Sequence, residues 1–177
     1  VGAWSGVYSL VLLLLWTLGG GLDLLDQNIR DFTWSPLTTG VVFILAFSLI
    51  GSLLDLPFTL YHTFVVEQKF GFNKMTAKLF ISDLFKQTLL MFVIAAPLIW
   101  VILWLMASAG TMWWAWAWAV WVGFSVLMMW AYPTFIAPLF NKFEPMKNQA
   151  LKTAIEDLLT KCGFESNGLF QMDGSKR

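Results

Sequence analysis

Polar side chains that could do chemistry recur at regular intervals within the second long apolar stretch of the sequence. Ser48, Ser52, Asp55, Thr59 and His62 are spaced i, i+4, i+7, i+11 and i+14. Seven residues of α-helix make nearly two turns, so this spacing places them on one stripe of a helix. An Asp within a membrane span usually faces the bundle interior or a water-filled cavity. The spacing therefore predicts a polar stripe that faces hydrated space.

The third apolar stretch begins with a further pair, Asp83 and Lys86, one helical turn apart and able to form an ion pair. Asp55 lies about 26 Å along a helix that starts near Thr38, toward one edge of the membrane. Two interpretations stay open: these groups line a hydrated cavity, or they extend to the nearby membrane surface and satisfy one another. The first interpretation predicts a chamber-facing set of Ser48, Ser52, Asp55, Thr59, His62, Asp83 and Lys86.

The chain has 1 His and 1 Cys, which restricts the catalysis it could perform. Zinc peptidases need several converging ligands, often as H-E-x-x-H, and a single His excludes that motif. No G-x-S-x-G segment or phosphate-cradling glycine loop occurs, and nothing places Cys162 beside His62. We therefore expect no catalytic and no metal-binding residue in this chain.

The composition explains where these polar groups must sit. The chain is 58% hydrophobic and 12% charged, whereas soluble domains are about 25% charged. A span needs about 20 apolar helical residues, and four such stretches occur. We predict an all-α polytopic transmembrane bundle over residues 1–138, with spans at about 3–22, 38–66, 79–109 and 112–136 and a kink at Pro97.

The fourth span contains WWAWAWAVW, which alternates like a strand. A lone strand would leave its backbone unpaired in lipid, so we expect a helix. Trp114, Trp118 and Trp121 then share a face, which is typical of an interfacial aromatic belt.

Charge predicts the orientation. Four spans put both ends of the chain on one side, and of the 11 Lys and Arg residues only Arg30 lies on the other. The positive-inside rule makes the side of the termini cytoplasmic.

Residues 139–177 have a different composition, which predicts the incomplete beginning of a cytoplasmic α/β-type soluble domain. Apolar residues from Leu151 to Leu159 form one stripe of a charged helix, with Gly163 as its C-cap. GLFQMD predicts a short strand and DGS a turn. A start at Val1 within an apolar run suggests a fragment of a longer chain.

Three segments carry a family resemblance. DLPFTLYHTFVVEQKFGFNKMT resembles L-P-x-x-L-Y-x-T-F-V-x-E-x-K-x-G-F-N-x-x-T of the type I CAAX prenyl endopeptidases. YPTFIAPLFNKFEPM is similar to that family's P-x-x-I-x-P-L-F-N-K-F-x-P, and LFQMDGSKR to its L-F-x-x-D-G-S-K-R. The segments follow the family's order over about residues 55–177. The resemblance implies structural roles for Pro57, Tyr61, Glu67, Lys69, Gly71, Phe72, Asn73, Pro138, Asn141, Lys142, Asp173 and Gly174.

The same resemblance implies an integral-membrane zinc metalloendopeptidase, in which seven helices enclose a hydrated chamber with zinc at its cytoplasmic end. The zinc ligands would lie downstream, so zinc belongs to the full-length enzyme and this chain alone should bind none and be inactive. The implied partners are the lipid bilayer, a membrane-associated or lipidated polypeptide substrate and the remainder of the polypeptide, with no nucleic acid. We expect a bacterial inner membrane, a C-terminal side in the cytoplasm and a further span before Val1.

Two alternatives remain. One is a small transporter or channel subunit that uses the polar stripe as a pathway, although no repeat of the kind common in transporters is visible. The other is a non-catalytic membrane scaffold. An H-E-x-x-H motif downstream would favour the protease.

Overall fold

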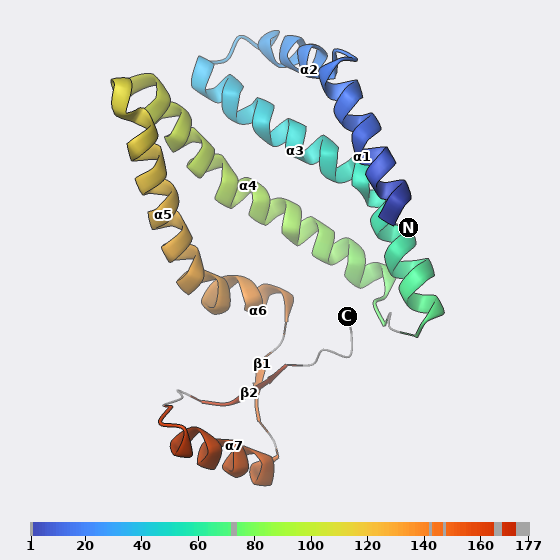
Figure 1. The fold of residues 1–177 in the computed structure, drawn as a ribbon, viewed down its shortest axis with the longest axis vertical. Coiled ribbons are helices and arrows are strands. Elements are labelled where there is room, and N and C mark those ends of the chain that lie inside the picture. Colours follow the sequence, from blue (N-terminus) through green and yellow to red (C-terminus); the bar gives the residue numbers. More distant parts are fainter. Residues whose placement is uncertain (1, 72–73, 142, 147, 165–167, 173–177) are drawn as a thin grey trace. The chain divides into compact units, whose positions relative to one another are not determined.

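The structure is a computed structural model that describes residues 2–71, 74–141, 143–146, 148–164 and 168–172. The chain divides into two compact units, Val1–Val122 and Gly123–Arg177, with the boundary inside one helix. Helices dominate both units (Figure 1). The predicted all-α membrane bundle is confirmed as the fold class.

The first unit opens with two helices separated by glycines. Helix α1 (Gly2–Thr17) and helix α2 (Gly21–Arg30) differ in direction by 51°. Gly20 adopts φ +74°, a left-handed conformation that side chains disfavour. A Cβ on Gly19 would lie 2.6 Å from the Leu15 carbonyl oxygen, so the neighbouring position also needs glycine. The expected first span, residues 3–22, is therefore interrupted at Thr17, and the acidic segment that follows is itself helical.

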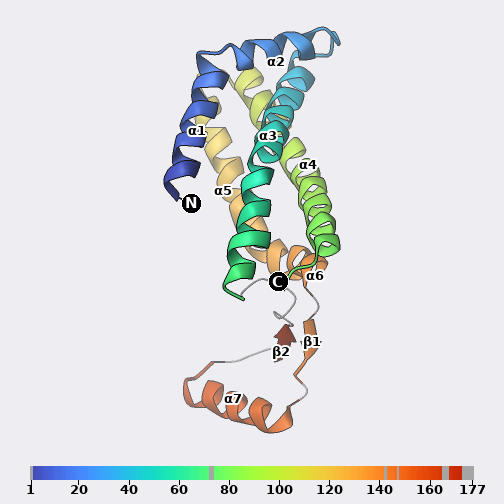
Figure 2. The ribbon, with the colours of Figure 1, turned by 90° about the vertical axis from the view of Figure 1, so that its right-hand side faces the viewer.

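Helix α2 is amphipathic. Its acidic side carries an ion pair between Arg30 Nε and Asp26 Oδ2 at 2.6 Å, whereas Ile29 is buried. Figure 2 shows α2 across the ends of α1 and α3 rather than parallel to them.

The second span is helix α3 (Pro36–Tyr61) followed by the π-helical turn η1 (His62–Glu67). Ser35 caps α3, because its hydroxyl accepts the Thr38 N–H at 3.3 Å, and Pro36 occupies the first turn, where its missing N–H costs nothing. The turn after η1 ends at Gly71, which adopts φ +72° and donates its N–H to the Gln68 carbonyl at 3.1 Å.

The third span is helix α4 (Ala77–Ser108), capped by the Thr76 hydroxyl, which accepts the Leu79 N–H at 3.3 Å. The helix continues through Pro97 without interruption. It runs antiparallel to α3, since a Cβ placed on Gly40 would lie 2.8 Å from Leu103 Cδ1 at one end and the rings of Phe64 and Phe80 lie 5.6 Å apart at the other. The two helices lie side by side in Figures 1 and 2.

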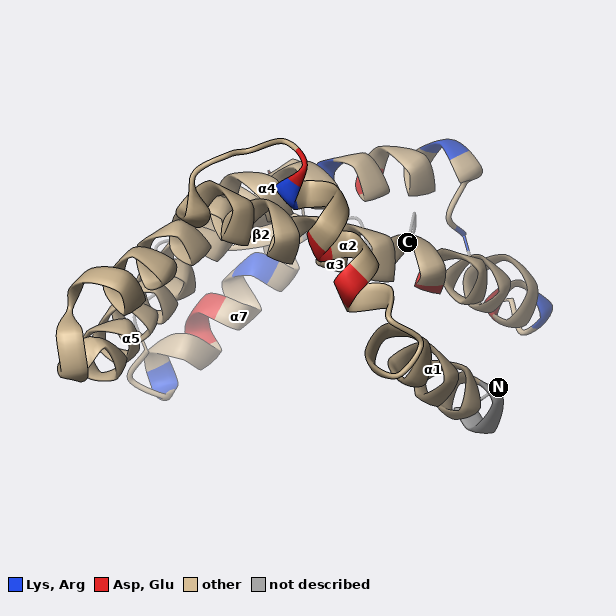
Figure 3. Ribbon diagram, turned by 90° about the horizontal axis from the view of Figure 1, so that it is seen from above, with Lys and Arg blue, Asp and Glu red and all other residues tan. Residues whose placement is uncertain are grey.

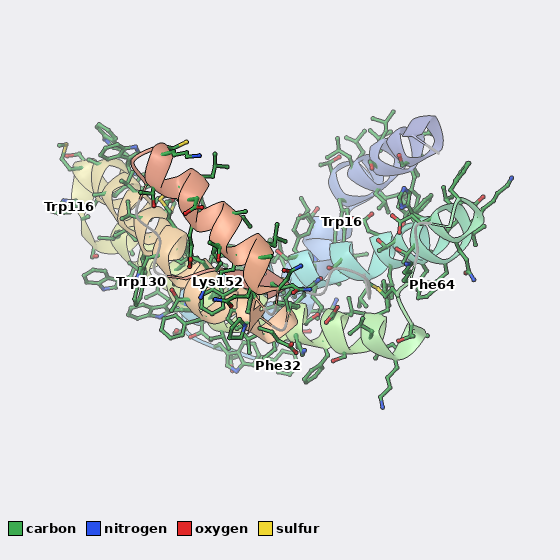
Figure 4. The ribbon with its side chains drawn as sticks, turned by 90° about the horizontal axis from the view of Figure 1, so that it is seen from below. Trp16, Phe32, Phe64, Trp116, Trp130 and Lys152 are labelled. Atoms are coloured by element: carbon green, nitrogen blue, oxygen red, sulfur yellow. The ribbon has the colours of Figure 1, made fainter. Side chains whose placement is uncertain are left out.

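A short 3-10 turn η2 (Gly110–Met112) leads into helix α5 (Trp113–Ala131), so WWAWAWAVW is helical as expected. A π-helical turn η3 (Tyr132–Ile136) and the short helix α6 (Ala137–Phe140) continue it. Trp116 and Trp130 extend outward from the helix (Figure 4), with exposed fractions of 60% and 61%.

The second unit ends in a small α/β element. Strands β1 (Phe143–Pro145) and β2 (Phe170–Met172) pair antiparallel, with Glu144 opposite Gln171. Helix α7 (Gln149–Lys161) lies between them in sequence. Its C-terminus forms a Schellman motif: Phe164 N–H bonds the Leu159 carbonyl at 2.9 Å, and Gly163, at φ +72°, bonds Thr160 at 3.1 Å. The expected cap at Gly163 and strand within GLFQMD are confirmed, whereas the DGS turn lies outside the described residues.

Among the described residues, three helices are long and apolar enough to cross a membrane: Pro36–Glu67, Ala77–Ser108 and Gly110–Phe140. The bent pair Ser5–Thr17 and Gly21–Arg30 makes a fourth if it counts as one span. Figure 3 shows charge concentrated at α2, at helix ends and on α7, with long uncharged stretches of α4 and α5. This distribution is the one that a hydrocarbon environment requires.

Candidate functional site

The polar stripe of α3 is the candidate site, and the structure leaves it uncovered within this chain. All its members are exposed: Ser48, Ser52, Asp55, Thr59 and His62. The continuous helix from Pro36 through Glu67 confirms that they lie on one helical element. The helical spacing is therefore present as expected, while the identity of the space that the stripe faces stays a prediction.

Two hydroxyls of the stripe bond back to their own helix. Ser48 donates to the Ile44 carbonyl at 2.8 Å, and Thr59 donates to the Asp55 carbonyl at 3.2 Å. Such bonds satisfy the hydroxyl hydrogens without a neighbouring helix. The hydroxyl oxygens of Ser48 and Thr59 can still accept hydrogen bonds, and the Asp55 side chain is exposed.

A different side of α3 packs against α1 through aromatic residues. The Tyr8 and Phe58 rings lie 4.5 Å apart, and the Trp16 and Phe47 rings 5.0 Å apart. The Tyr8 hydroxyl also donates to the Leu54 carbonyl at 2.7 Å. At 100° per residue, these contact positions fall roughly a quarter turn or more from the centre of the stripe. The α1 contact therefore fixes the rotation of α3 without covering the stripe.

The π-helical turn η1 brings one further residue beside the stripe. His62 Nδ1 lies 3.1 Å from Glu67 Oε1, and both side chains are partly exposed, at 54% and 39%. In an α-helix, residues five apart point about 140° away from each other. A π-helix closes its turns with i→i+5 hydrogen bonds, so here they are neighbours. Helical periodicity alone missed Glu67 as a member of this cluster, because sequence spacing does not reveal a π turn.

Asp83 and Lys86 differ from the stripe. Asp83 is buried, with an exposed fraction of 7%, and Lys86 is half-buried. Both lie near the start of α4, next to the end of α3 that carries His62 in the antiparallel pair. Their place in the chamber-facing set and their mutual ion pair stay predictions.

The family-motif residues concentrate at the ends of helices. Pro57 and Tyr61 lie in the last turns of α3, Glu67 closes η1, and Lys69 and Gly71 form the turn that follows. In the second unit, Pro138 lies in α6 and Asn141 immediately follows it. The motif positions outside the described residues are Phe72, Asn73, Lys142, Asp173 and Gly174.

In the described part of the chain, no group of at least three His, Cys, Asp or Glu side chains could hold a metal ion. The one His is already engaged at Nδ1 by Glu67. The donor set of these residues does not fit a zinc site.

The long apolar helices and the distribution of charge define a multi-pass membrane protein. The family profile described as CAAX prenyl protease N-terminal, five membrane helices, matches residues 1–142. The chain therefore belongs to the CAAX prenyl protease family of membrane metalloproteases, whose N-terminal membrane region it represents.

Individual relatives support this assignment. The chain is 34% identical over 157 residues to the probable CAAX prenyl protease 1 of Schizosaccharomyces pombe, covering 88% of this chain and 33% of that protein. It is 33% identical over 181 residues to the human CAAX prenyl protease 1 homolog, covering 98% of this chain and 38% of that protein. The crystal structure of S. mikatae Ste24p matches with a TM-score of 0.93 and 32% identity, over 98% of this chain and 42% of that one.

The chain thus spans about a third of the length of the curated relatives it matches. The relatives named here are eukaryotic, and the expected bacterial inner membrane receives no support from them.

Proposed function

We propose that this chain forms the membrane wall of a zinc metalloendopeptidase of the CAAX prenyl protease type. In this proposal the stripe of α3 lines a hydrated intramembrane chamber. The chamber admits a membrane-associated or lipidated polypeptide to a zinc site encoded further along the polypeptide. The observation that carries the proposal is the exposure of the whole stripe, Asp55 included, on a helix long enough to span a bilayer.

The free-energy cost of placing a charged side chain in lipid favours water over lipid beside the polar stripe. An ionised Asp facing hydrocarbon near the centre of a membrane costs about 2.5–3.5 kcal/mol on insertion scales. Exposed Ser and Thr hydroxyls that bond their own helix are tolerated in either environment. Asp55 lies toward one edge of the membrane, where this cost is smaller than at the centre, and it is the stripe residue whose exposure favours hydrated space over lipid contact.

The proposal includes Asp83 and Lys86 at the cytoplasmic end of the chamber, near the start of α4. It also includes the orientation predicted from charge, with Lys69, Lys74 and Lys78 in the cytoplasm. In the full enzyme, zinc would supply the Lewis acid and the activated water for peptide hydrolysis. The residues of this chain would admit, hydrate and orient the substrate.

Thiol accessibility tests the chamber. In full-length protein with Cys162→Ser, a cysteine at Ser52→Cys should react with a charged, membrane-impermeant thiosulfonate at least about ten times faster than one at Leu53→Cys. Both positions are exposed in this chain and adjacent in sequence, but lipid excludes ionised thiols and charged reagents. Equal rates at the two positions would contradict a hydrated chamber on this face.

Activity tests the enzymatic part separately. The full-length protein should cleave a membrane-anchored prenylated peptide, and a zinc chelator should abolish cleavage. A hydrated stripe in a protein that cleaves no such peptide would favour the non-catalytic membrane scaffold instead.

A further inference from the structure

We infer that Glu67 is a positioning residue: by bonding His62 it holds the π-helical turn η1, and that turn sets how α3 meets the cytoplasmic loop. The separation of 3.1 Å between His62 Nδ1 and Glu67 Oε1 is a hydrogen bond when Nδ1 carries the proton, and an ion pair when the imidazole is charged. The inference goes beyond the proposed function and rests on it only where cleavage is measured.

The spacing of the pair ties it to this turn. A side-chain contact between residues five apart forms in π geometry and is lost in α geometry, where the two side chains point to different sides of the helix. The His62–Glu67 pair therefore stabilises the π-helical conformation of this turn relative to the α-helical one. π-helical turns inside α-helices are frequent at functional sites, and η1 begins at His62, the last residue of the polar stripe.

A second contact shows why the conformation of the turn matters. Phe64, inside η1, packs edge-on against Phe80 in the first turn of α4, with ring centroids 5.6 Å apart. Figure 4 shows Phe64 near the end of α3. The turn thus packs an aromatic ring against α4 while its His62–Glu67 pair remains partly exposed. A shift to α geometry would rotate everything after the turn relative to the stripe.

The strength of the His62–Glu67 pair limits the effect expected from its removal. A partly exposed ion pair contributes little, and its loss shifts a local equilibrium by about two- to fivefold rather than abolishing the turn. Both side chains are at the surface of this chain, so their substitution should leave the thermal midpoint within about 2–4 °C of wild type.

A double-mutant cycle in full-length protein gives the kinetic test. His62→Ala and Glu67→Ala should each lower kcat/KM for a membrane-anchored peptide about two- to fivefold, and the double variant should lose no more than either single one. Glu67→Gln keeps an acceptor for the Nδ1 proton and should stay within about twofold of wild type. The neighbouring exposed Gln68→Ala is the matched control and should behave as wild type. Losses that multiply in the double variant would overturn the inference.

A labelling test works without activity. With Cys162→Ser, a reporter at Gln68→Cys lies just past the turn, and one at Ser52→Cys lies well before it. Adding Glu67→Ala should change the labelling rate at position 68 about two- to fivefold and leave position 52 unchanged. An unchanged rate at position 68 would overturn the inference. If wild-type protein cleaves nothing, the proposed function fails, while this labelling result still decides the role of Glu67.

Discussion

Individual side chains fix the rotation of the helices in the first unit. Tyr8 makes two such contacts: its ring lies 4.5 Å from the Phe58 ring at a tilt of 45°, and its hydroxyl donates to the Leu54 carbonyl. Leu54 lies one turn before Pro57, a residue without an N–H to donate to the helix. The Tyr8 bond therefore reaches α3 one residue after Leu53, whose carbonyl receives no N–H from Pro57.

Tyr8→Phe should reveal the contribution of that hydroxyl. The substitution keeps the ring and removes one interhelical hydrogen bond, which in membranes contributes about 0.6 kcal/mol on average. We expect the free energy of unfolding in detergent to fall by about 0.5–1 kcal/mol. Tyr8→Leu, which also removes the ring contact, should cost more. Equal stability of wild type and Tyr8→Phe would contradict a role for the bond.

At the scale of elements, close approach of α3 and α4 depends on a small residue. A Cβ on Gly40 would lie 2.8 Å from Leu103 Cδ1, and the neighbours Thr39 and Val41 are buried. Small residues permit such contacts between membrane helices, where packing rather than the hydrophobic effect holds helices together.

Gly40→Leu should therefore destabilise the α3–α4 pair by about 1–3 kcal/mol through overpacking. Gly40→Ala should cost less, because the contacting atom is the end of a flexible side chain. Gly51→Leu on the same helix is the matched control, since nothing in the described chain lies within 4 Å of its Cβ position. Thermal unfolding of the detergent-solubilised protein measures all three, and a loss at position 51 equal to that at position 40 would contradict this account.

At the scale of the whole molecule, the proposed orientation makes opposite predictions for two exposed positions. Cys162, at the end of α7, belongs to the side proposed as cytoplasmic. Asp23, in α2, belongs to the other side.

In sealed vesicles, an impermeant maleimide should label native Cys162 only from the cytoplasmic face. With Cys162→Ser, a cysteine at Asp23→Cys should be labelled only from the opposite face, because the reagent cannot cross the hydrocarbon core. Labelling of both positions from the same face would disprove the orientation.

Much of the architecture was predictable from the sequence. Long apolar stretches require helices in lipid, so the spans from Pro36 to Glu67, from Ala77 to Ser108 and from Gly110 to Phe140 followed from composition. The glycine cap at Gly163 followed from residue type, because glycine alone adopts positive φ at little cost. The first span was less predictable, because the glycines after Thr17 bend the chain and start a separate amphipathic helix.

The sequence by itself determined the fold class, the helical spacing of the polar stripe and the family resemblance. Each of these depends on local periodicity or on the identity and order of the residues in a motif. Only the tertiary structure decided which groups meet across elements or across an altered helical turn. In the folded chain the whole stripe is exposed, Asp83 is buried, and the Tyr8 hydroxyl donates to the Leu54 carbonyl. The tertiary structure also placed Glu67 beside His62, since a π turn changes which side chains are neighbours and leaves no mark in the periodicity of the sequence.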